Sequence, residues 1–383
     1  MTTLTLRGLT WNHTRGLAPL LATAPTYSEL HPNISIQWEA RNFWSFGEEP
    51  LDRFASEYDF IVFDHPFTGA SAKQGLLIAL DDVLPASYLA DQRENSVGHS
   101  FASYTYQDKQ VALAIDAAVQ LAAWRTDLMD AAGHRPPNTW QEVIDLAEAT
   151  GRVVAPLAPM GAMGTFFSIC AGAGKPAAAS CERFVAEEVG AMALDTLAAL
   201  YRVSGSECLT TGAAGILQRM ATSDEVIYAP CQYGYNNFAR EGHAAHRLSF
   251  GPVPTLDAAN TGGANLGGAG IGVFAASKHR AEAVDYLRWI ASEEIQRTLY
   301  THAGGQPGHR AAWLDDTNNH ITGGFFRDTL PDCDHAYCRP TYLGFPVFQS
   351  AAGQLLQSFL RGECATRDTL HTLEKLYLQS LDA

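Results

Sequence analysis

The sequence contains no apolar stretch long enough to span a lipid bilayer and no cluster of basic residues. Lysine and arginine together number 26, against 41 aspartates and glutamates, so the formal net charge at pH 7 is −15. An acidic surface repels the phosphate backbone of DNA and RNA. We therefore expect neither nucleic-acid binding nor membrane insertion.

Familiar catalytic motifs are also missing. The chain has no H-E-x-x-H, G-x-S-x-G or C-x-x-C sequence. The glycine-rich segment 262–270 precedes a predicted strand, whereas a dinucleotide fingerprint follows a strand and opens a helix. The pair Gly174-Lys175 lacks the other residues of a phosphate-binding loop. We predict a protein that is not an enzyme and that carries no cofactor.

The seven cysteines form no obvious framework. Their number is odd and the chain is large, which fits reduced thiols better than a set of disulfides. Cys333, His335 and Cys338 have the spacing of a metal clip, but a closed zinc site needs four ligands. We expect no metal here, and instead a loop with free thiols or one local disulfide.

The N-terminal residues lack the basic start and long apolar core of a signal peptide. Residues 1–7 alternate between polar and apolar side chains, which is typical of a strand inside a fold. No cysteine lies near enough to the N-terminus for a lipid anchor. Two locations stay open: the periplasm if a signal peptide was removed, and the cytoplasm if Met1 is the native start.

Strand and helix patterns alternate along the 383 residues, of which 46% are hydrophobic. Residues 34–39 alternate between apolar and polar side chains, and residues 60–63 are an unbroken apolar run typical of a buried parallel strand. Thr139 and Glu142 have the spacing of a helix capping box. This order predicts an α/β fold with right-handed crossovers. The expected strands are 4–9, 34–38, 60–63, 111–115, 153–157, 226–229 and 271–275, and the expected helices include 16–30, 118–131, 185–203, 280–292 and 293–302.

Several segments, in order, resemble the extracellular solute-binding proteins of family 1, the sugar-binding type that serves ABC importers. Residues 58–64 and 75–82 are similar to the family's strand and its "G-x-L-x-x-L-D" segment. Residues 124–140 resemble its "Y-N-x-D-L … G … P-x-T-W-x-E" stretch. The strongest match is residues 267–310, where the family has a double glycine at the cleft, a strand and two helices.

The resemblance implies a two-lobed, periplasmic-binding-protein-like fold. Each lobe is expected to be a mostly parallel sheet flanked by helices, with the ligand cleft between the lobes. The expected N-terminal lobe comprises residues 1–112 plus 265–310, and the expected C-terminal lobe comprises residues 113–264 plus 311–383. The implied partners are a small-molecule ligand and an ABC permease, and we expect the chain to be a monomer.

Polar and aromatic residues follow several of the expected strands, which is where ligands bind in open α/β sheets. Aromatic rings mixed with amides and charges suit a small polar ligand, and glycines let the backbone approach it. Each of these residues also has a structural interpretation, such as capping the core, bonding a loop or forming a turn. The expected ligand-binding residues are Trp11, His13, Arg41, Asp64, His65, Phe67, Asp116, Tyr233, Tyr235, Gly267 and Gly268.

The predicted function is a solute-binding protein that holds a small polar or anionic ligand between two hinged lobes for an ABC importer. The guanidinium of Arg41 matches a carboxylate, and His13 and His65 can add donors. In the other interpretation, Arg41 pairs with a carboxylate of its own lobe and the site binds an uncharged sugar on aromatic rings. The alternative function is a cytosolic enzyme or sensor on the same fold that acts on a small acidic metabolite.

Overall fold

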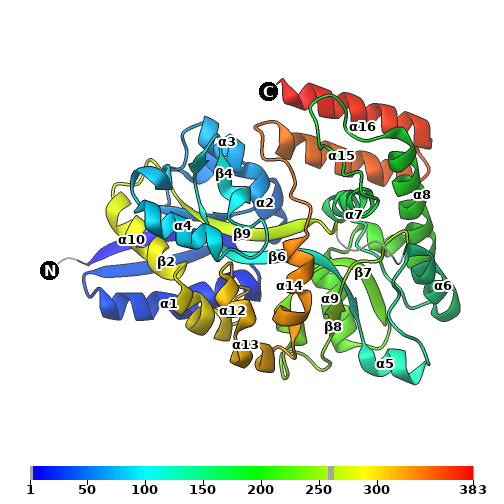
Figure 1. Ribbon diagram of the computed structural model, residues 1–383, viewed down its shortest axis with the longest axis horizontal. Helices are drawn as coiled ribbons and strands as arrows, with labels where there is room; N and C mark the ends of the chain where they lie inside the picture. The colour runs from blue at the N-terminus through cyan, green and yellow to red at the C-terminus, as the bar shows by residue number, and fades with distance from the viewer. Residues whose placement is uncertain (1–2, 258–262, 383) are drawn as a thin grey trace. The chain divides into compact units, whose positions relative to one another are not determined.

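The computed structural model describes residues 3–257 and 263–382 (Figure 1). Contacts between residues divide the chain into two compact units. Unit 1 consists of Met1–Ala118, Gly267–Arg327 and Thr341–Leu343, and unit 2 consists of Val119–Leu266, Asp328–Pro340 and Gly344–Ala383. The two lobes, with the bounds expected from the sequence, stay a prediction.

The sheet of unit 1 is mostly parallel. Its strands have the order β2-β1-β3-β9-β6. β1 pairs in parallel with β2 and with β3, while β9 runs antiparallel to β3. These strands are β1 (Leu4–Trp11), β2 (Ile34–Arg41), β3 (Phe60–Phe63), β9 (Leu266–Val273) and the first part of β6 (Leu113–Trp124). The α/β class expected from the sequence is therefore confirmed.

Helices connect the strands of unit 1, and α1 packs on β1 and β2 (Figure 1). The helices are α1 (Thr14–Leu30), α2 (Phe43–Glu48), α3 (Thr68–Lys73), α4 (Ala86–Glu94), α10 (Arg280–Ile290), α11 (Glu293–Ile295), α12 (Arg310–Leu314) and α13 (Asp316–Ile321). A short hairpin joins β4 (Thr105–Tyr106) to β5 (Lys109–Gln110). α14 (Phe325–Asp334) begins in unit 1 and ends in unit 2.

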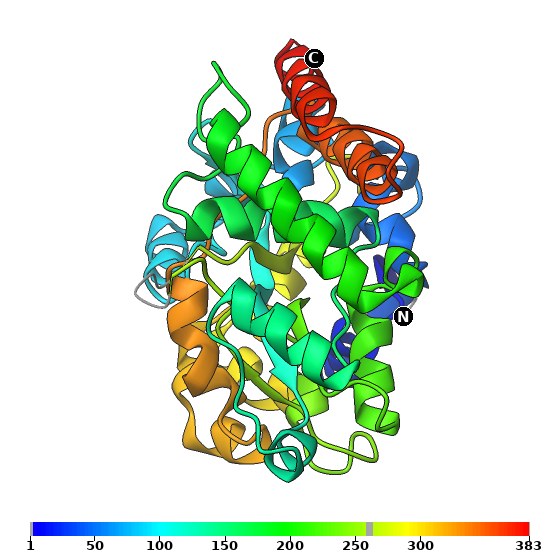
Figure 2. The ribbon, with the colours of Figure 1, turned by 90° about the vertical axis from the view of Figure 1, so that its right-hand side faces the viewer.

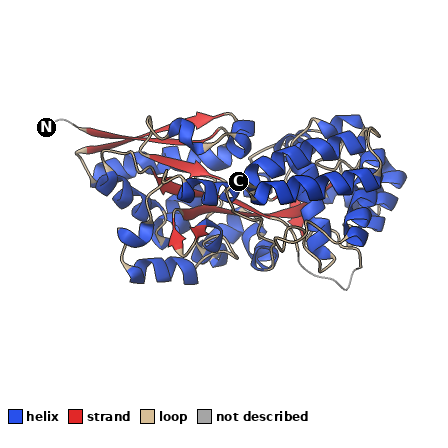
Figure 3. Cartoon of the chain, turned by 90° about the horizontal axis from the view of Figure 1, so that it is seen from above, coloured by secondary structure: helices blue, strands red, loops and turns tan. Residues whose placement is uncertain are grey.

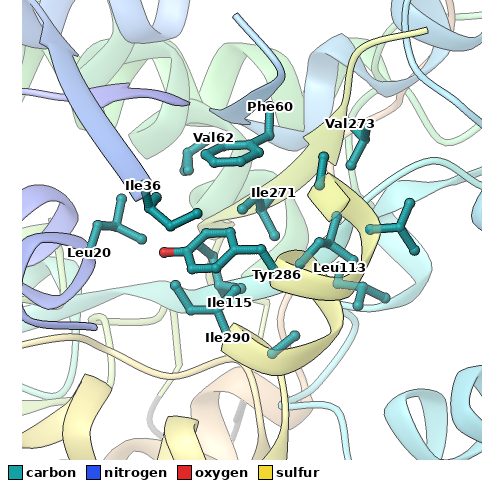
Figure 4. Close-up of a cluster of buried hydrophobic side chains, with 14 of the residues drawn as sticks. Leu20, Ile36, Phe60, Val62, Leu113, Ile115, Ile271, Val273, Tyr286 and Ile290 are labelled. Atoms are coloured by element: carbon teal, nitrogen blue, oxygen red, sulfur yellow. The ribbon is translucent and has the colours of Figure 1, made fainter. Parts of the chain in front are cut away.

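The core of unit 1 is formed around Tyr286 of α10, which is fully buried (Figure 4). Its ring stacks on Phe60 at a centroid distance of 5.2 Å, and its hydroxyl accepts a hydrogen bond of 3.2 Å from Trp38 Nε1. The polar end of the tyrosine is thus satisfied inside an apolar cluster. This cluster joins α10 to the sheet.

Unit 2 is mostly helical (Figure 3). α7 and α16 both pack against α8, and α15 packs against α7 (Figure 2). The second part of β6 pairs antiparallel with β7 (Tyr228–Tyr233) and with β8 (Ser249–Gly251), which differs from the parallel sheet expected for this half. The helices are α5 (Thr126–Ala131), α6 (Trp140–Thr150), α7 (Pro159–Gly172), α8 (Glu187–Ser204), α9 (Ala213–Thr222), α15 (Phe345–Leu360) and α16 (Thr366–Leu381).

The helix expected over residues 118–131 is wrong over most of its length. β6 continues to Trp124, and only Thr126–Ala131 is helical. Alanine-rich sequence favours a helix locally, but pairing of this segment with β7 and β8 overrides that preference. Asp116 therefore lies within a strand and does not follow one.

Two further strand predictions differ from the structure. Residues 153–157 contribute only an isolated bridge between Val153 and Tyr228. Three of the glycines expected to precede a strand, Gly267, Gly268 and Gly270, lie within β9, which begins at Leu266, and Gly263 lies before it. A strand can contain glycine where another backbone approaches closely, and Gly262 lies outside the described residues.

The capping box predicted at the start of α6 is confirmed. The Thr139 side chain accepts a hydrogen bond of 3.2 Å from the backbone N–H of Glu142, whose carboxylate accepts one from the backbone N–H of Thr139. The helix ends at Gly151 in the left-handed conformation, with φ of 65°. Both ends of α6 thus follow from local sequence.

A buried ion pair joins α1 to β6. Arg15 donates from Nε and Nη2 to the two carboxylate oxygens of Asp116, at 2.9 and 2.8 Å. Asp116 is fully buried, and burial raises the pKa of its carboxyl to about 6, although Arg15 acts in the opposite direction. Without Arg15, the charged carboxylate would have lost the partner that makes its burial tolerable.

We expect Arg15→Met to lower the free energy of unfolding by about 3–5 kcal/mol at pH 8, because it leaves a buried carboxylate unpaired. The loss is expected to shrink at pH 5. A carboxyl whose pKa is raised by folding binds its proton more tightly in the folded state, so stability recovers as the pH falls below that pKa. Urea unfolding at both pH values measures the change.

The matched control is Lys109→Met, which removes the cation of an exposed pair with Asp82 at 2.9 Å. This change is expected to cost about 0–1 kcal/mol at either pH. Equal losses for the two variants would contradict the role given to the buried pair.

We expect Thr139→Ala to lower the free energy of unfolding by about 1 kcal/mol, because a backbone N–H at the start of α6 loses its acceptor. Thr210→Ala serves as the control, since Thr210 is exposed and its hydroxyl donates a hydrogen bond to the carbonyl of Glu207. Guanidinium unfolding measures the free energy of unfolding of both variants, and an equal decrease in the two would contradict the prediction.

Candidate functional site

The carboxyl ends of three parallel strands meet at one edge of the unit 1 sheet. β1 ends at Trp11, which pairs with Arg41 at the end of β2, and β3 ends one residue before Asp64. β9 enters the sheet at this edge because it runs antiparallel and pairs Gly270 with Phe63. We call the predicted residues of unit 1 the strand-end cluster: Trp11, His13, Arg41, Asp64, His65, Phe67, Asp116, Gly267 and Gly268.

Trp11 and Arg41 share one aromatic neighbour in this cluster. The Trp11 ring lies 4.6 Å from the ring of Phe46, and the Arg41 guanidinium lies 5.3 Å from the same ring. Phe54 lies 5.2 Å from that guanidinium. Cation–π attraction of this kind stabilises a guanidinium that has lost its water.

The guanidinium of Arg41 is incompletely hydrogen-bonded. Arg41 is 7% exposed, and its Nη2 donates one long bond of 3.4 Å to the carbonyl of Val62. Within the described residues, neither its Nε and Nη1 nor the Nε1 of Trp11 has a hydrogen-bond partner. Burial lowers the pKa of Arg41 to about 10, so the group stays charged at neutral pH. The cluster therefore contains three buried donors and a positive charge.

No carboxylate among the described residues forms an ion pair with Arg41, and Glu49 acts on it only through its field. The interpretation in which Arg41 pairs with a carboxylate of its own lobe thus has no contact to support it in the described part of the chain. A buried cation without a counter-charge costs free energy unless something compensates it.

Asp64 and His65 lie together at the end of β3. His65 Nδ1 lies 3.2 Å from Asp64 Oδ1, and the His65 side chain is buried. Phe67 is also buried and packs in an apolar cluster with Phe63. Asp64 remains partly exposed, which leaves it the more accessible of the three.

His13 caps the first turn of α1. Its Nδ1 accepts a hydrogen bond of 3.0 Å from the backbone N–H of Arg15. Burying N–H groups at a helix start requires such an acceptor. This contact gives one ring nitrogen of His13 a structural role.

Gly268 has a structural reason to lack a side chain. Its φ is +114°, and a Cβ there would collide with the carbonyl of Asp116 in β6. Gly267 is buried beside it. Gly268 therefore lets β9 approach β6 within unit 1. Both oxygens of the Asp116 side chain are engaged by Arg15.

Tyr233 and Tyr235 belong to unit 2; Tyr233 is the last residue of β7, and Tyr235 follows two residues later. The hydroxyl of Tyr233 accepts a hydrogen bond of 2.8 Å from Asn265 Nδ2, and Tyr233 is partly exposed. Tyr235 is buried. One turn later, Arg240 Nε donates to Asn236 Oδ1 at 2.8 Å, and burial lowers the pKa of Arg240 to about 10.

Sequence reasoning missed Arg15, Asn265 and Arg240. Arg15 had a local signal, because it is a basic residue in the first turn after the first strand. Arg240 follows the aromatic and amide segment after β7, which is a similar signal. Nothing in the sequence around Asn265 indicates its contact with Tyr233, 32 positions away.

No group of three or more histidine, cysteine, aspartate or glutamate side chains that could hold a metal ion occurs in the described parts of the chain. Likewise, no described helix is long and apolar enough to cross a membrane.

Solved structures show the same fold at low sequence identity. Maltose-bound MalE3 of T. maritima has a TM-score of 0.84 at 16% identity, with 99% of each chain covered. The GacH receptor of Streptomyces glaucescens has a TM-score of 0.82 at 18% identity, and the match covers 100% of this chain and 99% of that one. An ABC transporter solute-binding protein from Thermotoga lettingae, bound with α-D-tagatose, has a TM-score of 0.83 at 17% identity, and the match covers 100% of each chain.

A search of curated protein sequences gives no match. The model of the bacterial extracellular solute-binding protein family matches residues 53–316, which is more than half of the chain. The structures confirm the periplasmic-binding-protein-like fold that the resemblance implied. On the strength of the family match, this chain belongs to the bacterial extracellular solute-binding proteins.

Proposed function

We propose that this chain is the solute receptor of an ABC importer and binds a small polyhydroxylated solute that carries a carboxylate. In this proposal a permease takes over the solute. The observation that carries it is the set of buried donors at Trp11 and Arg41.

Those donors suit an oxygen-rich, negatively charged group. Arg41 Nε and Nη1 and Trp11 Nε1 are all N–H groups, so the complementary atoms must be acceptors. A carboxylate supplies acceptor oxygens in the planar arrangement that a guanidinium fork matches. It also supplies the counter-charge that Arg41 lacks among the described residues.

The hydroxylated part of the proposal comes from the fold relatives. Their structures are described as bound with maltose, α-D-tagatose and D-mannitol, which are sugars and a polyol. In our proposal Trp11, Tyr233 and Tyr235 cover the apolar faces of such a molecule, and Asp64 accepts from its hydroxyls. A sugar acid combines both requirements.

The test is a thermal-shift screen with matched neutral and acidic compounds: galactose with galacturonate, and glucitol with gluconate. A compound present at 100 times its Kd stabilises the folded state by about 2.7 kcal/mol, which raises Tm visibly. We expect the acid of a pair to raise Tm more than its neutral partner. Stabilisation by the neutral compounds alone would support the uncharged-sugar interpretation instead.

We expect Arg41→Met to weaken binding of the acid by about tenfold or more, because a charge-assisted hydrogen bond contributes about 1.5–3 kcal/mol. Affinity for the neutral partner should change little. Without ligand, the variant should be as stable as the parent or more stable, since methionine removes an uncompensated buried charge. Isothermal titration calorimetry and urea unfolding measure the two effects.

Arg53→Met is the matched control, because Arg53 lies close by in the chain but is exposed and paired with Glu49 at 3.4 Å. It should leave both binding and stability unchanged within about 0.5 kcal/mol. If Arg41→Met weakens the acid and its neutral partner equally, or neither, the carboxylate does not contact Arg41 and the anionic part of the proposal is wrong.

A further inference from the structure

Asn265 is held on three sides where the chain enters β9. Its backbone N–H donates to Ser168 Oγ at 2.9 Å, and its carbonyl accepts from the backbone N–H of Gln120 at 3.0 Å. Its side-chain Nδ2 donates to the hydroxyl of Tyr233 at 2.8 Å. Asn265 is 1% exposed, so these contacts are made without competition from water.

Further hydrogen bonds lead from Ser168 to β7, the strand that contains Tyr233. Ser168 Oγ donates to Gln120 Oε1 at 2.6 Å, and Gln120 Nε2 donates to the carbonyl of Cys231 at 3.1 Å. Cys231 lies two residues before Tyr233 in β7. We call Gln120, Ser168 and Asn265 the amide relay. All of its members lie in unit 2, and they come from β6, α7 and the entrance to β9.

β7, the strand that contains Tyr233, is irregular at Cys231, where Gln120 of the relay bonds to it. Cys231 has a φ of +52°, and the β6–β7 register shifts between Leu121 and Ala123. A non-glycine residue in the left-handed region is strained and persists only where its surroundings hold it. A bulge of this kind re-aims the side chains that follow it. The relay thus holds both the bulge, through Cys231, and the side chain of Tyr233.

α7 approaches the relay so closely that it needs a glycine. A Cβ at Gly164 would lie 2.9 Å from Gln120 Nε2 and 3.4 Å from Asn265 Nδ2. A methyl group there would have to displace the Gln120 amide, and it would also touch the Asn265 amide. Gly164 therefore offers a way to disturb the relay without removing any of its hydrogen-bonding groups.

We propose that Asn265 is a positioning residue that, with Gln120 and Ser168, fixes the phenol of Tyr233 for solute binding. Asn265 Nδ2 donates a hydrogen bond to the phenolic oxygen of Tyr233, so the hydroxyl proton of Tyr233 points away from Asn265. The inference rests on the proposed function, in which Tyr233 contacts the solute.

The first experiment reads the ring directly and needs no ligand. With 3-fluorotyrosine incorporated at position 233, the fluorine resonance of the protein is compared with that of Asn265→Ala and Gly164→Ala. Both variants should shift or broaden the resonance. Gln357→Ala is the control, because this buried amide of unit 2 bonds the carbonyls of Leu157 and Leu209 instead. An unchanged resonance in Asn265→Ala would overturn the inference.

The second experiment measures galacturonate and galactose binding by calorimetry. Tyr233→Phe and Asn265→Ala should each weaken the compound that binds by about three- to tenfold, as expected for loss of one neutral hydrogen bond. The double variant should be no weaker than Tyr233→Phe, because Asn265 acts through the hydroxyl that phenylalanine lacks. Additive losses would mean that Asn265 acts independently of Tyr233, which overturns the inference.

Asn265→Asp tests the direction of the hydrogen bond. A carboxylate at position 265 has no N–H to donate to the Tyr233 hydroxyl, so this hydrogen bond cannot form in its present direction, which should weaken binding at least as much as Asn265→Ala. If Asn265 variants fail to fold, Ser168→Ala interrupts the relay one step earlier and is measured in the same way. Binding of neither compound by the parent protein would contradict the proposed function, and the fluorine resonance then decides on the positioning role alone.

Discussion

The parallel pairing of β1 with β2 and β3 is the constraint on which the candidate site of unit 1 depends. Parallel strands present their carboxyl ends at one edge, and so residues separated by tens of positions become neighbours there. The pairing of Trp11 with Arg41 follows directly from this register. Tyr286 of α10 packs against the middle of this sheet.

Two arginines at this edge show how burial of charge is handled in different ways. Arg15 meets Asp116 through two hydrogen bonds, and the pair joins α1 to β6. Arg41 meets aromatic rings and one carbonyl, and no described carboxylate neutralises it. The first arrangement is complete within unit 1. In our proposal, an acceptor group of the solute completes the second.

Local sequence predicted those features that depend on near neighbours. The strand at residues 60–63 followed from its apolar run, and the capping box of α6 followed from the spacing of Thr139 and Glu142. The alanine-rich segment after residue 118 was mispredicted as a helix because its strand conformation depends on partners more than 100 positions away, such as Tyr233 opposite Gln120. Arg15 and Asp116 are 101 positions apart, and Ser168 and Asn265 are 97 apart. Such contacts leave no periodic trace in the chain, so the ligand residues of both units stay predictions.

The interleaving of the two units along the chain has a consequence for synthesis. Unit 1 needs β9, yet the whole stretch Val119–Leu266 of unit 2 is made before that strand emerges from the ribosome. The edge of β3 that pairs with β9 therefore stays uncovered while more than half of the polypeptide is translated. An uncovered strand edge of apolar sequence invites association with other chains. Slowing translation between residues 119 and 266 should lengthen that exposure, so the yield of folded protein from a cell depends on how quickly this middle segment is completed.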